Sequence, residues 1–234
     1  MKKKMLFISI AMLSVFFLLI GTYKLMNSRT VQLYGGLTNK VETNQKVVAL
    51  TFDDGPTKNV DPVLVLLNKY DVKATFFLIG NEIEKNQEEA IKIVEAGHQV
   101  GNHTYSHQRM VLKSPSFIKE EIEKTDDLIK SIGYEGEIDF RPPNGKKLAA
   151  LPYYLDKNKK ETITWNIEPD TADDKVEYVK RNIKNGSIIL LHPMYDQSGE
   201  QLKLLERIIK LLSEEGFEFL TVNELQELKR EEQD

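Results

Sequence analysis

Residues 47–55 read Val-Val-Ala-Leu-Thr-Phe-Asp-Asp-Gly, an uninterrupted apolar run that ends in two carboxylates and a glycine. A short apolar, β-branched run closed by turn residues is typical of a strand buried on both faces. Further runs of this kind follow at 75–79, 98–101, 138–141, 162–166, 187–191 and 217–220. The first run therefore predicts a buried strand, and the later runs predict further strands of the same kind.

Helical patterns fill the intervals between these strands. Asp61-Pro62 has the residue types of an N-cap and first turn leading into a helix over 63–70, and Ser114-Pro115 opens a helix that ends near Gly133. Two more patterns cover 81–96 and 202–212, each followed by glycine. This alternation predicts an α/β fold with a parallel sheet covered by helices. Because about 190 residues are few for a complete eight-fold barrel of ~250, we expect a distorted (β/α) barrel of about seven parallel strands, with a doubly wound open sheet as the alternative.

An apolar segment precedes this domain. The uncharged run from Met5 to Tyr23 would span roughly 28 Å as a helix, close to the hydrocarbon thickness of a bilayer. Three lysines before it predict a cytoplasmic tail at 1–4, a transmembrane signal anchor at 5–23, a stalk at 24–45 and an extracellular domain at 46–230. The protein would then be a single-pass protein of the cell membrane. A cleaved signal peptide and a secreted form are the alternative, although no small-x-small cleavage site follows the run.

Composition excludes several kinds of site. The 234 residues contain no cysteine, which rules out thiolate zinc sites, iron–sulfur clusters and cysteine nucleophiles. Residues 1–29 hold five basic and no acidic side chains, so the rest of the chain carries 27 basic and 36 acidic residues, a net charge of −9. An acidic body argues against nucleic acid as a partner. We expect a monomer.

The candidate reactive residues stand just beyond the carboxyl ends of predicted strands. In parallel α/β barrels the active site is built on that rim, so residues far apart in sequence would meet there. His98 begins a strand and falls on the opposite rim. The residues on the expected rim are Asp53, Asp54, His103, Arg141, Glu168 and His192.

A metal site is the sharpest hypothesis that these residue types support. His103 and His107 are four residues apart, so on one helical turn they would share a face and could bind one ion. Asp54 would complete a set of two histidines and one carboxylate that leaves positions open for water and substrate. Adjacent carboxylates cannot easily bind one ion together, so Asp53 is expected to act as general base toward a water on the metal, with His192 as the opposing acid. A solvated polar turn and a histidine at a strand end are the plainer interpretations.

Four motifs in order make the pattern specific. They are Thr51–Gly55 (TFDDG), His103–His107 (HTYSH), Arg141–Gly145 (RPPNG) and Leu190–His192 (LLH). In order and spacing, residues 45–225 resemble the polysaccharide deacetylases, the NodB-homology family or carbohydrate esterase family 4. The resemblance implies a distorted (β/α) barrel and a divalent metal, usually zinc, with cobalt, nickel or manganese as alternatives. It also implies hydrolysis of N-acetyl groups on chitin-like sugars or peptidoglycan, or of O-acetyl groups on xylan.

The resemblance also assigns roles residue by residue. Asp53 corresponds to the catalytic base, and Arg141 to the arginine that helps hold it. Leu190 would line the pocket for the acetyl methyl group, and His192 would be the general acid. The metal ligands would be Asp54, His103 and His107.

Two motifs depart from the family pattern. Asn144 stands where the family usually has an aromatic residue, which keeps the backbone N–H as an oxyanion donor but removes a sugar-stacking surface. In place of the family's Asp-x-x-Asp-Trp motif, Glu168 is expected to replace the first aspartate and orient His192, with Asp170 as the next candidate. The second aspartate and the tryptophan of the motif have no clear equivalents. Trp165 and Tyr195 would supply aromatic walls for substrate, or else pack structurally.

Three other functions compete with N-deacetylation of an acetylated cell-wall glycan. A non-haem iron oxygenase also uses two histidines and one carboxylate. An inactive, membrane-anchored wall-glycan binder and an O-acetyl esterase would share the fold. The retained base, acid and ligand set favour a metal-dependent polysaccharide N-deacetylase acting on peptidoglycan or chitin-like polymers.

Overall fold

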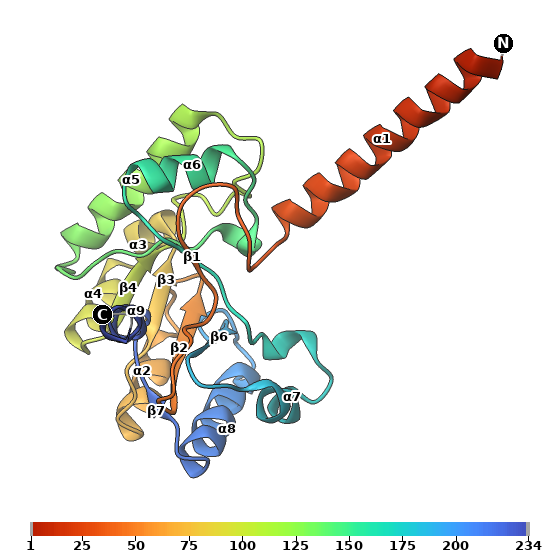
Figure 1. Ribbon diagram of the computed structural model, residues 1–234. Helices are drawn as coiled ribbons and strands as arrows, with labels where there is room; N and C mark the ends of the chain where they lie inside the picture. Colours follow the sequence, from red (N-terminus) through yellow and green to blue (C-terminus); the bar gives the residue numbers. More distant parts are fainter. Residues whose placement is uncertain (1, 233–234) are drawn as a thin grey trace.

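The computed structural model describes residues 2–232, so Met1, the first residue of the expected cytoplasmic tail, lies outside the described residues. Helix α1, Lys2–Met26, projects away from the folded body (Figure 1). It is long and apolar enough to cross a membrane, and its most apolar stretch is not buried against the protein. The helix can therefore serve as a signal anchor or as a signal peptide.

Parallel strands form the centre of the body. β2, Val47–Asp53, pairs on one side with β6, Ser187–Leu191. On its other side β2 pairs with β3, Thr75–Leu78, near its carboxyl end and with β7, Glu218–Phe219, near its amino end. β4, Gln99–Asn102, extends the sheet beyond β3. The α/β class with parallel strands is thereby confirmed.

Short pairings link the two sides of this sheet. β1, Leu37–Thr38, pairs with β5, Thr162–Ile163. Isolated parallel bridges join Phe140 to β4 and to β5, and join Ile167, just after β5, to β6. The pairings thus run in a ring from β2 through β3, β4, Phe140 and the β5 segment to β6 and back to β2.

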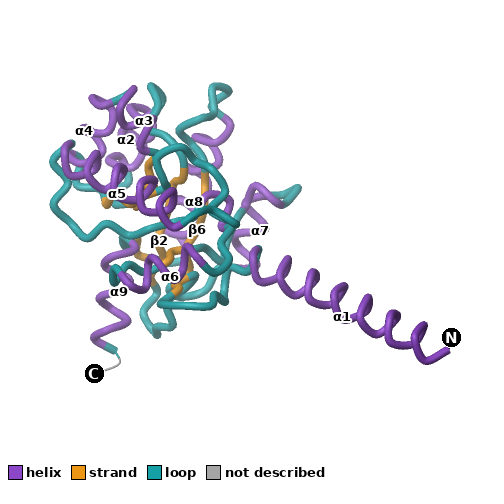
Figure 2. Tube along the Cα trace, turned by 90° about the horizontal axis from the view of Figure 1, so that it is seen from above, coloured by secondary structure: helices purple, strands orange, loops and turns teal. Residues whose placement is uncertain are grey.

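Helices pack around this ring of strands, as Figures 1 and 2 show. The main apolar cluster lies between the sheet and the outer helices, and includes Leu50, Phe52 and Ile208. A smaller cluster, with Val47 and Ala49, lies on the other face of β2, against residues of the C-terminal helix. The helices are α2 (Val60–Lys69), α3 (Gly80–Lys85), α4 (Gln87–Glu95), α5 (Pro115–Ser131), α6 (Ala150–Lys157), α7 (Lys175–Asn182), α8 (Glu200–Glu214) and α9 (Val222–Glu231).

Several predicted elements differ in detail. The strand expected at 138–141 is reduced to the single bridges of Phe140, because Arg141 is followed by two prolines that have no N–H to donate to a ladder. The helix expected at 81–96 is broken at Asn86, which has non-helical backbone angles. α2 begins at Val60, so Asp61 lies in its first turn rather than at its N-cap. The expected stalk contributes β1, and Val41 is fully buried.

Candidate active site

The first two site residues leave β2 in different directions. Alternate residues of a strand face opposite sides, so Val47, Ala49, Thr51 and Asp53 share the inner face. Asp53 is 3 % exposed at the end of this column. Asp54 has φ of +66°, and Gly55 has φ of +75° with Met194 so close that a Cβ there would lie 2.6 Å from its sulfur. This turn directs the two adjacent carboxylates apart, as expected if Asp53 acts as a base and Asp54 binds a metal.

Arg141 lies fully buried beneath Asp53 and holds it in place. Its Nη1 donates to Asp53 Oδ1 at 2.6 Å and to Thr51 Oγ1 at 2.8 Å, and its Nη2 donates to the Thr164 carbonyl at 3.1 Å. Burial by itself would raise the pKa of the Asp53 carboxyl, but the charge of Arg141, with smaller contributions from His103 and His192, lowers the pKa below its usual value. Asp53 is therefore ionised near neutral pH, the state that a general base needs.

The two expected metal-binding histidines meet on a loop, not on a helical turn. Residues 103–107 are irregular, and Thr104 and His107 both have positive φ, near +69° and +56°. The Asn102 side chain accepts the Thr104 N–H, and the Thr104 hydroxyl accepts the His107 N–H, so local side chains stabilise this loop. The expected helical geometry was wrong, but the two rings still lie close, with centroids 5.0 Å apart.

The tautomer of His103 is set by its backbone partner. His103 Nδ1 lies 2.8 Å from the Arg141 carbonyl oxygen, which can only accept, so Nδ1 carries the proton and Nε2 presents a lone pair. That Nε2 lies 3.7 Å from Asp54 Oδ1, and His107 Nε2 lies 3.1 Å from the same oxygen. The three side chains therefore turn their ligand atoms toward one point.

This cluster fits a divalent metal ion. The ligand atoms of Asp54, His103 and His107 lie within 4.8 Å of one another. Asp54 Oδ1 is buried and has no hydrogen-bond partner within residues 2–232, although the imidazole nitrogens are near. Burial lowers the pKa of both imidazoles, which keeps them neutral and able to bind a metal. Two imidazoles and one carboxylate suit zinc and the neighbouring divalent transition metals.

His192 follows β6 and is paired with Asp170, not with Glu168. Its Nδ1 lies 3.6 Å from Asp170 Oδ2. Asp170 is held in turn by Lys175 at 2.5 Å and by Gln201 at 2.8 Å. Burial alone would lower the pKa of His192, but Asp170, together with Asp53 and Asp54, raises it above its ordinary value. His192 is thus the group best suited to donate a proton.

Glu168, expected to orient His192, has other partners. Its Oε2 accepts from Trp165 Nε1 at 3.0 Å and from Arg29 Nη2 at 2.5 Å. Arg29 also stacks on the Trp165 ring, with its guanidinium carbon 4.5 Å from the centroid. Trp165 is 3 % exposed, so this ring is covered rather than open to substrate.

One cavity of about 180 Å³ unites most of the predicted residues. Arg141 lies beneath it, and Asn144 sits at its edge with φ of +56°. Tyr195 does not line it; this half-exposed side chain lines a separate cavity beside Met194. The residues lining the main cavity are Arg29, Asp53, Asp54, His103, His107, Asn144, Trp165, Glu168, Leu190 and His192.

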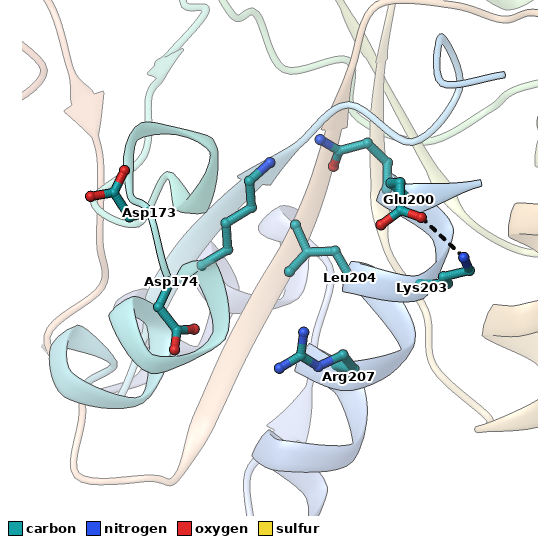
Figure 3. A pocket seen from close by; sticks show the side chains of 8 residues that line it. Asp173, Asp174, Glu200, Lys203, Leu204 and Arg207 are labelled. Atoms are coloured by element: carbon teal, nitrogen blue, oxygen red, sulfur yellow. Dashed lines mark hydrogen bonds and ion pairs between the residues drawn. The ribbon is translucent and has the colours of Figure 1, made fainter. Parts of the chain in front are cut away.

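A larger hollow of about 510 Å³ lies between α7 and α8 (Figure 3). Its lining is a mixture of opposite charges that includes Asp173, Glu200 and Arg207, with an ion pair between Glu200 and Lys203. None of the predicted catalytic residues lines it. The smaller cavity is therefore the candidate active site.

Comparisons with known proteins agree with this geometry. A family model described as polysaccharide deacetylase matches residues 40–163, more than half of the chain. The chain belongs to the polysaccharide deacetylase family. The chain is 33 % identical over 198 residues to the peptidoglycan-N-acetylmuramic acid deacetylase PdaC of Bacillus subtilis, covering 82 % of the present chain and 41 % of PdaC. It is 32 % identical over 199 residues to a peptidoglycan-N-acetylglucosamine deacetylase of Bacillus cereus, covering 82 % of the present chain and 93 % of the relative.

One of the solved structures that this chain resembles is that of a protein described as a pseudoenzyme. The wild-type BA3943 protein of Bacillus anthracis, described as a pseudoenzyme of carbohydrate esterase family 4, superposes with a TM-score of 0.71 at 30 % identity, over 84 % of this chain and 69 % of that one. Family membership alone therefore does not establish activity, and the residues of each member's site must be considered individually.

Sequence reasoning missed one residue of the site, Arg29, and placed another, Asp170, second. Arg29 was counted with the basic residues of the membrane segment, and no motif marked it. Asp170 was named only after Glu168, which was expected to replace the first aspartate of the family motif. The signal for Asp170 is the turn Pro169–Thr171, which directs the chain after Glu168 back toward α7 and α8.

Proposed function

We propose that this chain is a metal-dependent hydrolase that removes N-acetyl groups from cell-wall peptidoglycan, with Asp53 as base and His192 as acid. The observation that carries the proposal is the placement of an ionised carboxylate and a proton-donating imidazole in one cavity with the Asp54–His103–His107 cluster. A pair of groups whose pKa values are moved in opposite directions is the arrangement that acid–base hydrolysis needs.

Each side chain has a defined task in this mechanism. A divalent metal bound by Asp54, His103 and His107 would polarise the acetyl carbonyl and acidify a water molecule. Asp53 would accept a proton from the attacking water, while Arg141 keeps its carboxylate ionised and fixed. His192, charged with the help of Asp170, would give its proton to the leaving nitrogen. Leu190 would contact the acetyl methyl group, and the Asn144 backbone N–H would stabilise the oxyanion.

The N-terminal helix is proposed to remain as a membrane anchor, with the catalytic domain outside the cell. The chain is fixed to the body where α1 ends, because the Met26 carbonyl accepts the Lys147 backbone N–H at 3.2 Å. Cleavage just after the apolar run would cut beside a segment that the fold uses. The peptidoglycan deacetylases of Bacillus among its relatives support the cell's own wall as the substrate.

Acetate release tests the function directly. The full-length chain, loaded with zinc or cobalt, is incubated with peptidoglycan, chitooligosaccharides and acetylated xylan, and mass spectrometry locates the deacetylated sugar. We expect acetate from peptidoglycan. Asp53→Asn should retain the metal and lose about 10²–10⁴-fold in kcat, because a positioned base contributes that much. A metal-loaded wild type that binds peptidoglycan but releases no acetate would instead indicate an inactive binder, and release from xylan alone would indicate an O-acetyl esterase.

A further inference from the structure

The segment that leaves the anchor helix is built into the wall of the active site. Lys147, 1 % exposed, donates its backbone N–H to the Met26 carbonyl and its ammonium to the Ser28 carbonyl, at 3.2 Å and 2.5 Å. Thr164 donates its hydroxyl to the Arg29 carbonyl at 2.6 Å. The Ser28 hydroxyl accepts the Val31 N–H at 3.0 Å, which closes a local turn. The backbone on both sides of Arg29 is therefore held against the body of the protein.

The Arg29 side chain reaches into the cavity that contains the catalytic groups. Its guanidinium carbon lies 4.5 Å from the centroid of the Trp165 ring, and its Nη2 donates to Glu168, whose carboxylate also accepts the Trp165 N–H. Glu168 is mostly buried, whereas the Arg29 side chain is 42 % exposed. A guanidinium carries five N–H donors in a rigid plane, and within residues 2–232 the hydrogen bond from Arg29 to Glu168 uses only Nη2. Arg29 lines the cavity with its other N–H donors unused within residues 2–232.

Because of these contacts, the cavity wall offers a sugar the N–H groups of Arg29 instead of an aromatic ring on which it could stack. Trp165 is covered by Arg29, and Asn144 at the cavity edge has no aromatic ring. A sugar entering the cavity would meet a cation whose N–H groups seek oxygen acceptors. Hydroxyl, ring and carbonyl oxygens of a glycan are acceptors of this kind, and a planar cation fixed at one edge loses little conformational freedom on binding them.

We propose that Arg29 is a substrate-positioning residue that binds sugar oxygens of the glycan, and that Glu168 and Trp165 serve to hold it. This inference rests on the proposed function, since it concerns the substrate of the same site. It gives Glu168 a role separate from His192. It also makes the residues just after the membrane helix part of the glycan-binding site.

The test uses full-length protein in detergent and two independent readouts. The first is the dissociation constant for a chitooligosaccharide, compared between Asp53→Asn and Asp53→Asn/Arg29→Ala, in which turnover is suppressed. The second is kcat/KM of Arg29→Ala on the glycan and on 4-nitrophenyl acetate, a small ester without sugar. We expect glycan affinity and kcat/KM to fall about 10- to 100-fold, mainly through KM, as for the loss of one hydrogen bond to a charged group. Ester hydrolysis and bound metal should not change.

Matched variants separate positioning from structural damage. Arg29→Lys keeps the charge but not the planar fork, so it should recover part of the glycan affinity. Arg230→Ala removes a comparable exposed arginine, paired with Glu137 at 3.7 Å, and should match the wild type. Unchanged glycan affinity in Arg29→Ala would overturn the proposal, and so would an equal loss on glycan and ester. A wild type that releases no acetate, with glycan binding still weakened by Arg29→Ala, would reject the hydrolase and leave the role of Arg29 standing.

Discussion

Replacing Asp170 by asparagine tests which carboxylate charges the proton donor. Asp170 raises the pKa of His192, whereas burial of the imidazole alone would lower it. The protonated imidazole is the active form of a general acid, so activity is present below its pKa and is lost as the pH rises through it. Asp170→Asn should therefore move the alkaline limb of the pH–rate profile to lower pH.

The size of the effect follows from the 3.6 Å separation of His192 Nδ1 and Asp170 Oδ2. Two unit charges near this distance attract by about 1 kcal/mol in water and about 4 kcal/mol at an effective dielectric constant of 20. Both side chains are partly exposed, at 35 % and 25 %, so solvent screening reduces the upper figure. About 1–3 kcal/mol corresponds to a loss of about 5- to 160-fold in kcat at pH values on the alkaline limb.

The assay is the pH dependence of kcat on a soluble acetylated glycan, with metal content measured for every variant. Glu168→Gln is the matched control, because Glu168 contacts Arg29 and Trp165 instead of His192. It should change KM and leave the alkaline limb in place. A limb that moves in Glu168→Gln but stays in Asp170→Asn would refute the assignment of Asp170.

Three other predictions concern the metal ligands, a buried carboxyl group and the N-terminal helix. His103→Ala should lose most of the bound metal, as measured by elemental analysis, because its Nε2 faces Asp54; near-full metal in this variant would remove His103 from the ligand set. Burial raises the pKa of Asp139 to about 7, so ionising it destabilises the fold as pH rises from about 4 to 7. Asp139→Asn should then stabilise the protein by about 2–3 kcal/mol more at pH 8 than at pH 5, measured by urea unfolding, and equal effects at both pH values would contradict this. Protease treatment of intact cells should release the catalytic domain from the membrane fraction, whereas a shortened form found only in the medium would show that the N-terminal helix is cleaved.

Much of the fold could be predicted because its signals are local. The apolar runs at 47–53 and 187–191 have the length and residue types of buried strands, and both form as expected. Ser114 caps α5 with its side chain, as the Ser-Pro pair indicated. The region near Phe140 could not be predicted from its apolar character alone, because two prolines limit its pairing to single bridges. The break of the 81–96 helix at Asn86 is stabilised by a tertiary contact, since the Asn86 amide donates to the Pro56 carbonyl.

The sequence predicted which residue types form the candidate site and at which end of the strands they lie. It did not predict which side chains pair with one another. The carboxyl ends of parallel strands meet at one edge, which is why Asp54 and His103 were expected together. The path between His103 and His107 depends on two residues with positive φ, which spacing does not reveal. Arg29 could not be found because it is 139 residues from Glu168 in sequence and belongs to no motif.

The contacts of Glu168 explain why a different carboxylate, Asp170, is paired with His192. Arg29 binds Glu168 and covers Trp165, so Glu168, which was expected to orient His192, is paired with Arg29 instead. The turn Pro169–Thr171 then places Asp170 between His192, Lys175 and Gln201. Each carboxylate thus has its own cationic partners: Arg29 for Glu168, and Lys175 together with His192 for Asp170. Removing Arg29 should consequently weaken glycan binding without changing the pKa of His192. The same distinction is expected between Glu168→Gln, which should change KM, and Asp170→Asn, which should move the alkaline limb.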